Sequence, residues 1–135
     1  MADELILVYE TELPLSITVA DGTGIEKGTI LKSADPNTAS AAAALGDVVA
    51  GVAAGEKIAN DGRTQIAFYR KGRFKAKISG NVTNGDPLVI SGPTANNLLQ
   101  TAGVNAEQIF GTALETGTNG ETILVELNPT VMQLA

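Results

Sequence analysis

The sequence predicts an all-β protein with a compact β-barrel-like or β-sandwich-like domain, and three observations support this prediction. The chain has 135 residues, which suffices for one domain with its own hydrophobic core. Its 15 glycines, together with many Thr and Asn residues, are typical of short strands joined by tight turns. It contains no Trp and few other aromatic residues, so we expect an aliphatic core without an aromatic-walled ligand site.

The chain contains an internal repeat, with similar halves at about 24–68 and 81–127. Each half has a turn glycine, a short strand, a variable loop, an apolar strand that contains glycine, an Asp-Gly or Asn-Gly turn, and an alternating strand. The matched glycines are Gly28 with Gly85, Gly51 with Gly111, and Gly62 with Gly120. Duplication explains these matches better than chance, and we assign both halves to one β domain over residues 21–135.

The repeated glycines predict particular backbone geometries. Asp61-Gly62 and Asn119-Gly120 are dipeptides that favour two-residue hairpins, because both central residues of such a turn take positive φ. Gly51 and Gly111 lie inside apolar strands, which indicates a bulge or the close approach of another backbone segment.

A leading segment, residues 1–20, lies outside the repeat and predicts an extended N-terminal arm. It holds an apolar run at 5–9 and an alternating run at 13–19, where Pro14 favours an edge strand or an arm. Removing residues 2–12 should weaken binding to a partner and leave the fold intact. The Ala-rich stretch at 38–45 predicts a loop that can hold a turn of helix.

The composition argues against an enzyme. Without Cys and His the chain has no disulfide, no thiolate nucleophile and neither the usual neutral-pH base nor the commonest metal ligand. The run Asp21-Gly22-Thr23-Gly24 resembles the Asp-Thr-Gly of aspartic proteases, but Gly22 interrupts it and no second copy exists. We therefore expect no catalytic, cofactor-binding or metal-binding residues.

Charge and hydropathy restrict the partners. A net charge of -6 argues against general nucleic-acid binding, because phosphate affinity comes chiefly from Lys and Arg. The N-terminus is acidic where a signal peptide is basic, and no apolar run is long enough to cross a membrane. We expect a protein made in the cytoplasm that contacts neither DNA nor a membrane.

Five of the nine basic residues lie between positions 70 and 77. In this segment period-two alternation places Phe74, Ala76 and Ile78 on one face and the basic residues on the other. This basic strand predicts either a solvated face or a contact face for acidic protein. If it is a contact face, the acidic partner we expect is the leading segment of a neighbouring copy, which carries Asp3, Glu4, Glu10 and Glu12.

The predicted protein contacts therefore come from the leading segment and the basic strand. They are Leu5, Ile6, Leu7, Val8, Tyr9 and Leu13, together with Arg70, Lys71, Arg73, Lys75 and Lys77.

The order of the motifs carries a family resemblance over residues 12–128. The motifs are the runs at 28–31, 49–53, 62–66, 84–89, 110–114 and 125–127. This order resembles the decoration, or cement, proteins of tailed-bacteriophage heads. The resemblance implies a β-barrel-like protein that binds the outer surface of the expanded capsid, commonly as trimers, and stabilises the head.

The partners that the resemblance implies are the major capsid protein and further copies of the chain, as a homotrimer on the outer capsid surface of the virion. In related cement proteins an N-terminal arm often adds a strand to the major capsid protein, and residues 2–19 have the corresponding position. The alternative is another β-rich virion component, such as a tail, head-completion or fibre-associated domain.

Overall fold

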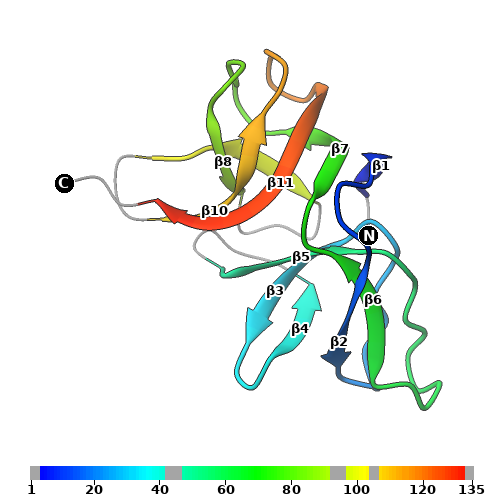
Figure 1. Cartoon of the computed structure of the whole chain (residues 1–135). Helices are drawn as coiled ribbons and strands as arrows, with labels where there is room; N and C mark the ends of the chain where they lie inside the picture. The colour runs from blue at the N-terminus through cyan, green and yellow to red at the C-terminus, as the bar shows by residue number, and fades with distance from the viewer. Residues whose placement is uncertain (1–3, 42–46, 92–96, 104–106, 133–135) are drawn as a thin grey trace.

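The computed structural model describes residues 4–41, 47–91, 97–103 and 107–132, and all regular secondary structure within them is β. The prediction of an all-β fold is confirmed. The strands are β1 (Ile6–Tyr9), β2 (Leu15–Val19), β3 (Ile30–Ala34), β4 (Thr38–Ala41), β5 (Val49–Ala53), β6 (Gln65–Tyr69), β7 (Gly72–Ile78), β8 (Pro87–Ile90), β9 (Leu98–Thr101), β10 (Glu107–Ala113) and β11 (Thr122–Met132), as Figure 1 shows.

The described strands form two closed barrels with the same connectivity. The first barrel has the order β2-β4-β3-β5-β6, and the second has β7-β9-β8-β10-β11, with β1 added to the outer edge of β7. In each barrel the first strand pairs in parallel with the third and antiparallel with the last. The second barrel lies above the first in Figure 1.

The leading segment differs from the predicted free arm, because both of its strands are paired. β2 forms ladders with β6 and β4, so that Ile17 and Val19 complete the core of the first barrel. Pro14 precedes the first residue of β2, where its missing N–H costs no ladder bond. The stretch predicted as a loop at 38–45 begins with β4, and residues 42–46 lie outside the described residues.

The structural repeat corrects one glycine pair. Gly120 corresponds to Asn60 and not to Gly62: each is the third residue of a turn closed by a backbone hydrogen bond, with φ of 87° at Gly120 and 62° at Asn60. Because Asn enters the left-handed region more readily than most residues, it can replace glycine there. In the predicted dipeptides Asp61-Gly62 and Asn119-Gly120 the glycine alone has positive φ, so neither forms a hairpin turn with positive φ at both central residues.

The strand glycines allow the close backbone approach that the sequence predicts. A β-carbon on Gly111 would overlap the carbonyl oxygen of Glu126 and lie 2.8 Å from its carbonyl carbon. A β-carbon on Gly51 would overlap the carbonyl oxygen of Tyr69 and lie 2.9 Å from the Phe68 ring. Both glycines lie where a register shift bends the ladder, so this prediction is confirmed.

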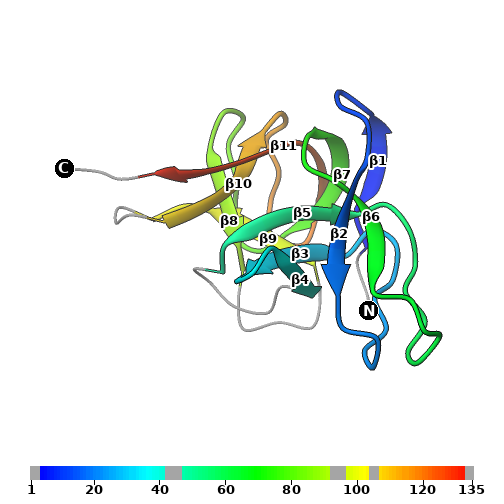
Figure 2. The ribbon, with the colours of Figure 1, turned by 60° about the horizontal axis from the view of Figure 1, so that its bottom comes forward.

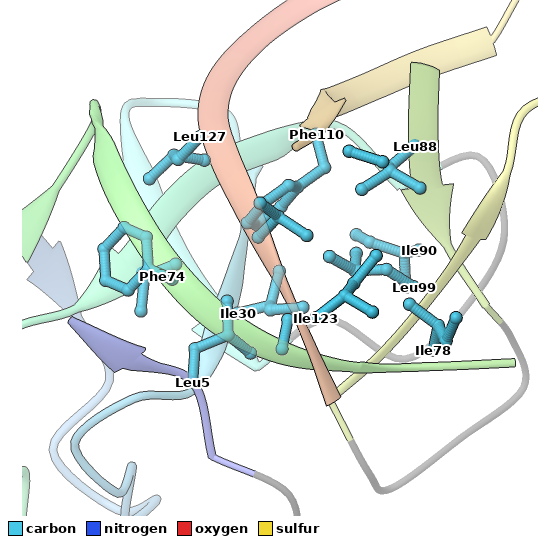
Figure 3. Close-up of a cluster of buried hydrophobic side chains, with 14 of the residues drawn as sticks. Leu5, Ile30, Phe74, Ile78, Leu88, Ile90, Leu99, Phe110, Ile123 and Leu127 are labelled. Carbon is cyan, nitrogen blue, oxygen red and sulfur yellow. The ribbon is translucent and has the colours of Figure 1, made fainter. Parts of the chain in front are cut away.

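Two hydrophobic clusters fill the barrels. The smaller cluster lies in the first barrel, and the larger one fills the second barrel and reaches the outer side of β3 and β5. The second barrel uses larger residues at corresponding places, such as Phe110 where the first barrel has Ala50. Figure 3 shows Leu5 and Ile30 beside Phe74, so the leading segment and the first barrel both pack onto the second barrel.

Candidate interaction surface

The two predicted contact segments lie side by side, because β1 pairs antiparallel with β7 (Figure 2). Ile6 lies opposite Lys75 and Tyr9 lies opposite Arg73, so these four side chains share the outer face of the sheet. The guanidinium carbon of Arg73 lies 5.9 Å from the centroid of the Tyr9 ring, within cation–π range. We call Ile6, Val8, Tyr9, Arg73 and Lys75 the β1–β7 surface.

The leading-segment residues divide into exposed and buried sets. Ile6, Val8, Tyr9 and Leu13 are exposed, with Ile6 at 64% of its full exposure. Leu5 is buried and its N–H donates to the carbonyl of Gly28 at 2.9 Å, while Leu7 is half-buried against the larger cluster. Leu5 and Leu7 therefore anchor β1 to the barrels instead of offering a contact, and removing residues 2–12 would damage the core.

Carboxylates of the same chain balance the basic face of β7. Lys75 Nζ lies 3.1 Å from Glu115 Oε1, and Arg73 Nε lies 3.4 Å from Glu126 Oε1. The hydrogen bond from Lys75 lowers the pKa of Glu115. Lys77 lies on the same face, opposite Thr122 of β11. This balance weakens the predicted attraction to an acidic neighbour, and because these pairs are exposed they contribute little to stability.

The two remaining basic residues connect β6 to β7. Arg70 Nη1 donates to the carbonyl of Ala50 at 3.0 Å, so its side chain holds the backbone of β5. Lys71 is exposed beside it. Of the acidic residues predicted as partners, Glu4, Glu10 and Glu12 are exposed, and Asp3 lies outside the described residues.

The outer edge of β1 is unpaired among the described strands, since β1 ends the strand order of its sheet. Natural edge strands are usually protected by Lys or Pro. β1 contains neither, although a register shift at Val8 bends it slightly. An edge with exposed aliphatic side chains can accept an additional strand through backbone hydrogen bonds.

Lys57 is a buried charge that no sequence signal marks. Its Nζ donates to Asp21 Oδ1 at 2.9 Å, to Asp61 Oδ1 at 2.7 Å and to two carbonyl oxygens, of Asp21 and Ile58. Burial lowers the pKa of Lys57, but the hydrogen bonds to both aspartates outweigh this effect and raise it. The hydrogen bond from Lys57 in turn lowers the pKa of Asp61 to about 2.

This arrangement gives Asp21 a structural explanation. Its carboxylate binds Lys57 and accepts the N–H of Gly62 at 2.9 Å, which ties together two loops at one end of the first barrel. The corresponding position in the second barrel is Gly117, which bridges to Val82 as Lys57 bridges to Ile25. Asp21, the acidic residue of the protease-like run at 21–24, is thus engaged in an ion pair with Lys57.

The described residues contain no group of three or more Asp and Glu side chains placed to hold a metal ion. Among them, no helix is long and apolar enough to cross a membrane. Within this part of the chain, the β1–β7 surface combines an unpaired strand edge with exposed aliphatic side chains, and it is the candidate interaction surface.

Fold and comparison define the chain as a tandem β-barrel protein. No protein-family model matches the sequence, and no curated protein matches it. The chain is similar in structure to the N base of the head fiber protein gp8.5 of bacteriophage phi29, with a TM-score of 0.57 and 16% sequence identity. The similarity covers 86% of this chain and 95% of that chain, and at this identity it establishes a shared fold.

Proposed function

We propose that this chain is a structural protein of a bacteriophage virion that binds the outer surface of the head and stabilises it, as a decoration protein without catalysis. The observation that carries the proposal is the fold shared with the base of a phage head fibre over 86% of the chain. The family resemblance of the sequence motifs, which is independent of that comparison, favours the same class of protein.

The β1–β7 surface is the proposed capsid-binding site. The open edge of β1 can pair with an extended segment of the major capsid protein, and Ile6 and Tyr9 can pack beside the added strand. The barrels hold β1 rigidly, because Leu5 is buried in the larger cluster. A preorganised edge loses little entropy on binding.

Self-association as a homotrimer completes the proposal. Linked copies bind a repeating lattice more tightly than single copies, because each further contact becomes intramolecular. Reinforcement of a capsid then needs contact area and rigidity, and no chemical step.

A second candidate is the base of a fibre or another fibre-associated part of the virion. The structural similarity to a head-fiber base favours it directly. A base must bind the head firmly enough to carry a fibre, but it need not change the stability of the head. The effect of the protein on head stability therefore separates the two candidates.

The test uses purified protein and heads of the phage that encodes it, with bound copies counted after sedimentation. A decoration protein binds at a fixed number of copies per head and raises the temperature at which heads open. Binding without stabilisation favours the fibre base, and failure to bind heads overturns the proposed function.

A matched pair of substitutions tests the β1–β7 surface. Ile6→Asp places a charge beside the edge of β1, whereas Ile58→Asp changes a side chain of similar exposure, 65% against 64%, in the first barrel. We expect Ile6→Asp to weaken head binding about tenfold or more and Ile58→Asp to leave it unchanged. Equal binding by both variants would remove this surface from the mechanism.

A further inference from the structure

The two barrels have the same connectivity, yet one end is closed in the second barrel and open in the first. In the second barrel this end holds Phe74, which is 1% exposed. Its ring lies 5.9 Å from the Tyr69 ring of the first barrel, Leu7 of β1 pairs opposite it, and Ile30, Val49 and Val52 of the first barrel belong to the same buried cluster. The last three side chains lie on the outer side of β3 and β5, because their chain neighbours belong to the cluster inside the first barrel, namely Leu31, Ala50 and Ala53.

The corresponding end of the first barrel lacks such a cover. Leu15 occupies in β2 the place of Phe74 in β7, because Leu15 pairs with Phe68 of β6 as Phe74 pairs with Val125 of β11. Leu15 lies on the same strand face as the buried Ile17, yet it is 48% exposed. A hollow of about 510 Å³ lies beside it.

We call this hollow the first-barrel opening. Its lining includes Leu15, Ile17, Ser33, Ala50, Phe68 and Arg70.

The opening is more polar than its counterpart in the second barrel. Ser33 replaces the buried Ile90, and Arg70 replaces the buried Leu127. Apolar residues remain beneath them, since Ala50 and Phe68 are both buried. A mixed apolar and polar lining is typical of interfaces between proteins that also exist apart.

We propose that a second copy of this chain covers the first-barrel opening, as the first barrel covers the second within each chain. The matching surface on the second copy is the accessible part of the outer side of β8 and β10, where Pro87 and Thr112 pair as Ile30 and Val52 do in β3 and β5. Ile109, which corresponds to Val49, is already buried within the chain and stays outside this surface. Thr112 is exposed, and the Pro87–Thr112 pair is less apolar than the Ile30–Val52 pair. Both sides of the interface are thus more polar than their counterparts within the chain.

This inference deepens the proposed function and rests on the self-association proposed there. The opening and the outer side of β8 and β10 are different surfaces, so the contact is heterologous. A homotrimer needs a heterologous contact, since an isologous contact pairs two copies and stops. The packing of the first barrel onto one end of the second barrel within each chain supplies the geometry for the contact between copies.

The test measures assembly by sedimentation velocity over a range of concentrations. Leu15→Lys alters the opening, Thr112→Arg alters the opposing surface, and Ile58→Lys is the control at an exposed apolar residue of the first barrel. We expect each of the first two variants to weaken assembly about tenfold or more, and the control to assemble like the wild type. Unchanged circular dichroism and thermal unfolding establish that each variant is folded.

Mixing the two weakened variants tests the heterologous geometry. A Thr112→Arg copy keeps an intact opening and a Leu15→Lys copy keeps an intact outer side, so the mixture should form dimers at a concentration at which each variant alone is monomeric. A monomeric wild type, normal assembly of Leu15→Lys, or no dimers in the mixture would overturn the inference.

Head binding separates this inference from the proposed function. If heads bind the protein but Leu15→Lys assembles normally, the inference fails and the function stands. If Leu15→Lys disrupts assembly but the wild type does not bind heads, the function fails and the inference stands.

Discussion

The substitution Gly111→Ala tests the closest backbone contact in the second barrel. Gly111 lies at the register shift between β10 and β11, the two strands that bend most visibly away from the barrel in Figure 1. A β-carbon there would overlap the carbonyl oxygen of Glu126 and lie 3.0 Å from the backbone nitrogen of Asn128. No side-chain rotation relieves this overlap, because both neighbours are backbone atoms.

The expected cost follows from overpacking. Backbone shifts forced by an added carbon typically cost 1–3 kcal/mol, and since the overlap here is with backbone, we expect about 3 kcal/mol. The entropy of unfolding of a chain of 135 residues is about 0.28 kcal/mol/K, so this cost lowers Tm by about 10 °C. Gly55→Ala is the matched control, because a β-carbon there meets no atom within 4 Å.

Thermal unfolding followed by circular dichroism measures both variants against the wild type. Gly55→Ala should unfold near the wild-type temperature. If Gly111→Ala also does so, the bent β10–β11 ladder does not require glycine, and the argument from backbone contact fails.

Three further predictions concern the larger core, a turn and the buried charge. Phe110→Ala removes a fully buried ring and should lower the free energy of unfolding in urea by about 3–5 kcal/mol; a cost under about 1 kcal/mol would contradict the assigned core. Asn60→Gly should be almost neutral, whereas Asn60→Val should cost about 1–2 kcal/mol because Asn60 has a φ of 62°; equal stability of both would refute the correspondence with Gly120. The folded pKa of Asp61, about 2, lies below its ordinary value of 3.8, so the stability that it contributes is complete above pH 4 and is lost as the pH falls toward 2. Acid titration should show a smaller loss in Asp61→Asn than in the wild type, because other carboxylates with lowered pKa, such as Glu115, remain; an equal loss in both would contradict this assignment.

Period-two alternation and strand glycines predict much of the fold. The alternation at 74–78 identified the buried and exposed faces of β7, and Gly51 and Gly111 identified the places of close backbone approach. Both signals are local: a strand half-buried in a sheet alternates, and a backbone contact excludes a β-carbon. Each therefore remains visible in the sequence.

Non-local pairing escapes such local patterns. β2 closes the first barrel by pairing in parallel with β4, which no turn connects to it, so the segment appeared in the sequence as a separate arm. Asn60 replaces glycine in a left-handed turn, which hid the true partner of Gly120.

The sequence also does not separate the exposed from the buried residues among the predicted contacts. The run from Leu5 to Tyr9 is apolar at every position, so no alternation separates the buried Leu5 from the exposed Ile6. Lys57 is surrounded in sequence by ordinary loop residues; its partner Asp61 lies four residues later in the same loop, whereas Asp21 comes from a separate loop. The three-dimensional structure was needed to place them together.

Electron cryomicroscopy of heads incubated with the purified protein tests the central proposal most directly. The proposal predicts density for two adjacent barrels at regular positions on the outer surface of the head, with β1 facing the capsid. Heads without such density, or density at the tail or inside the shell, would contradict it.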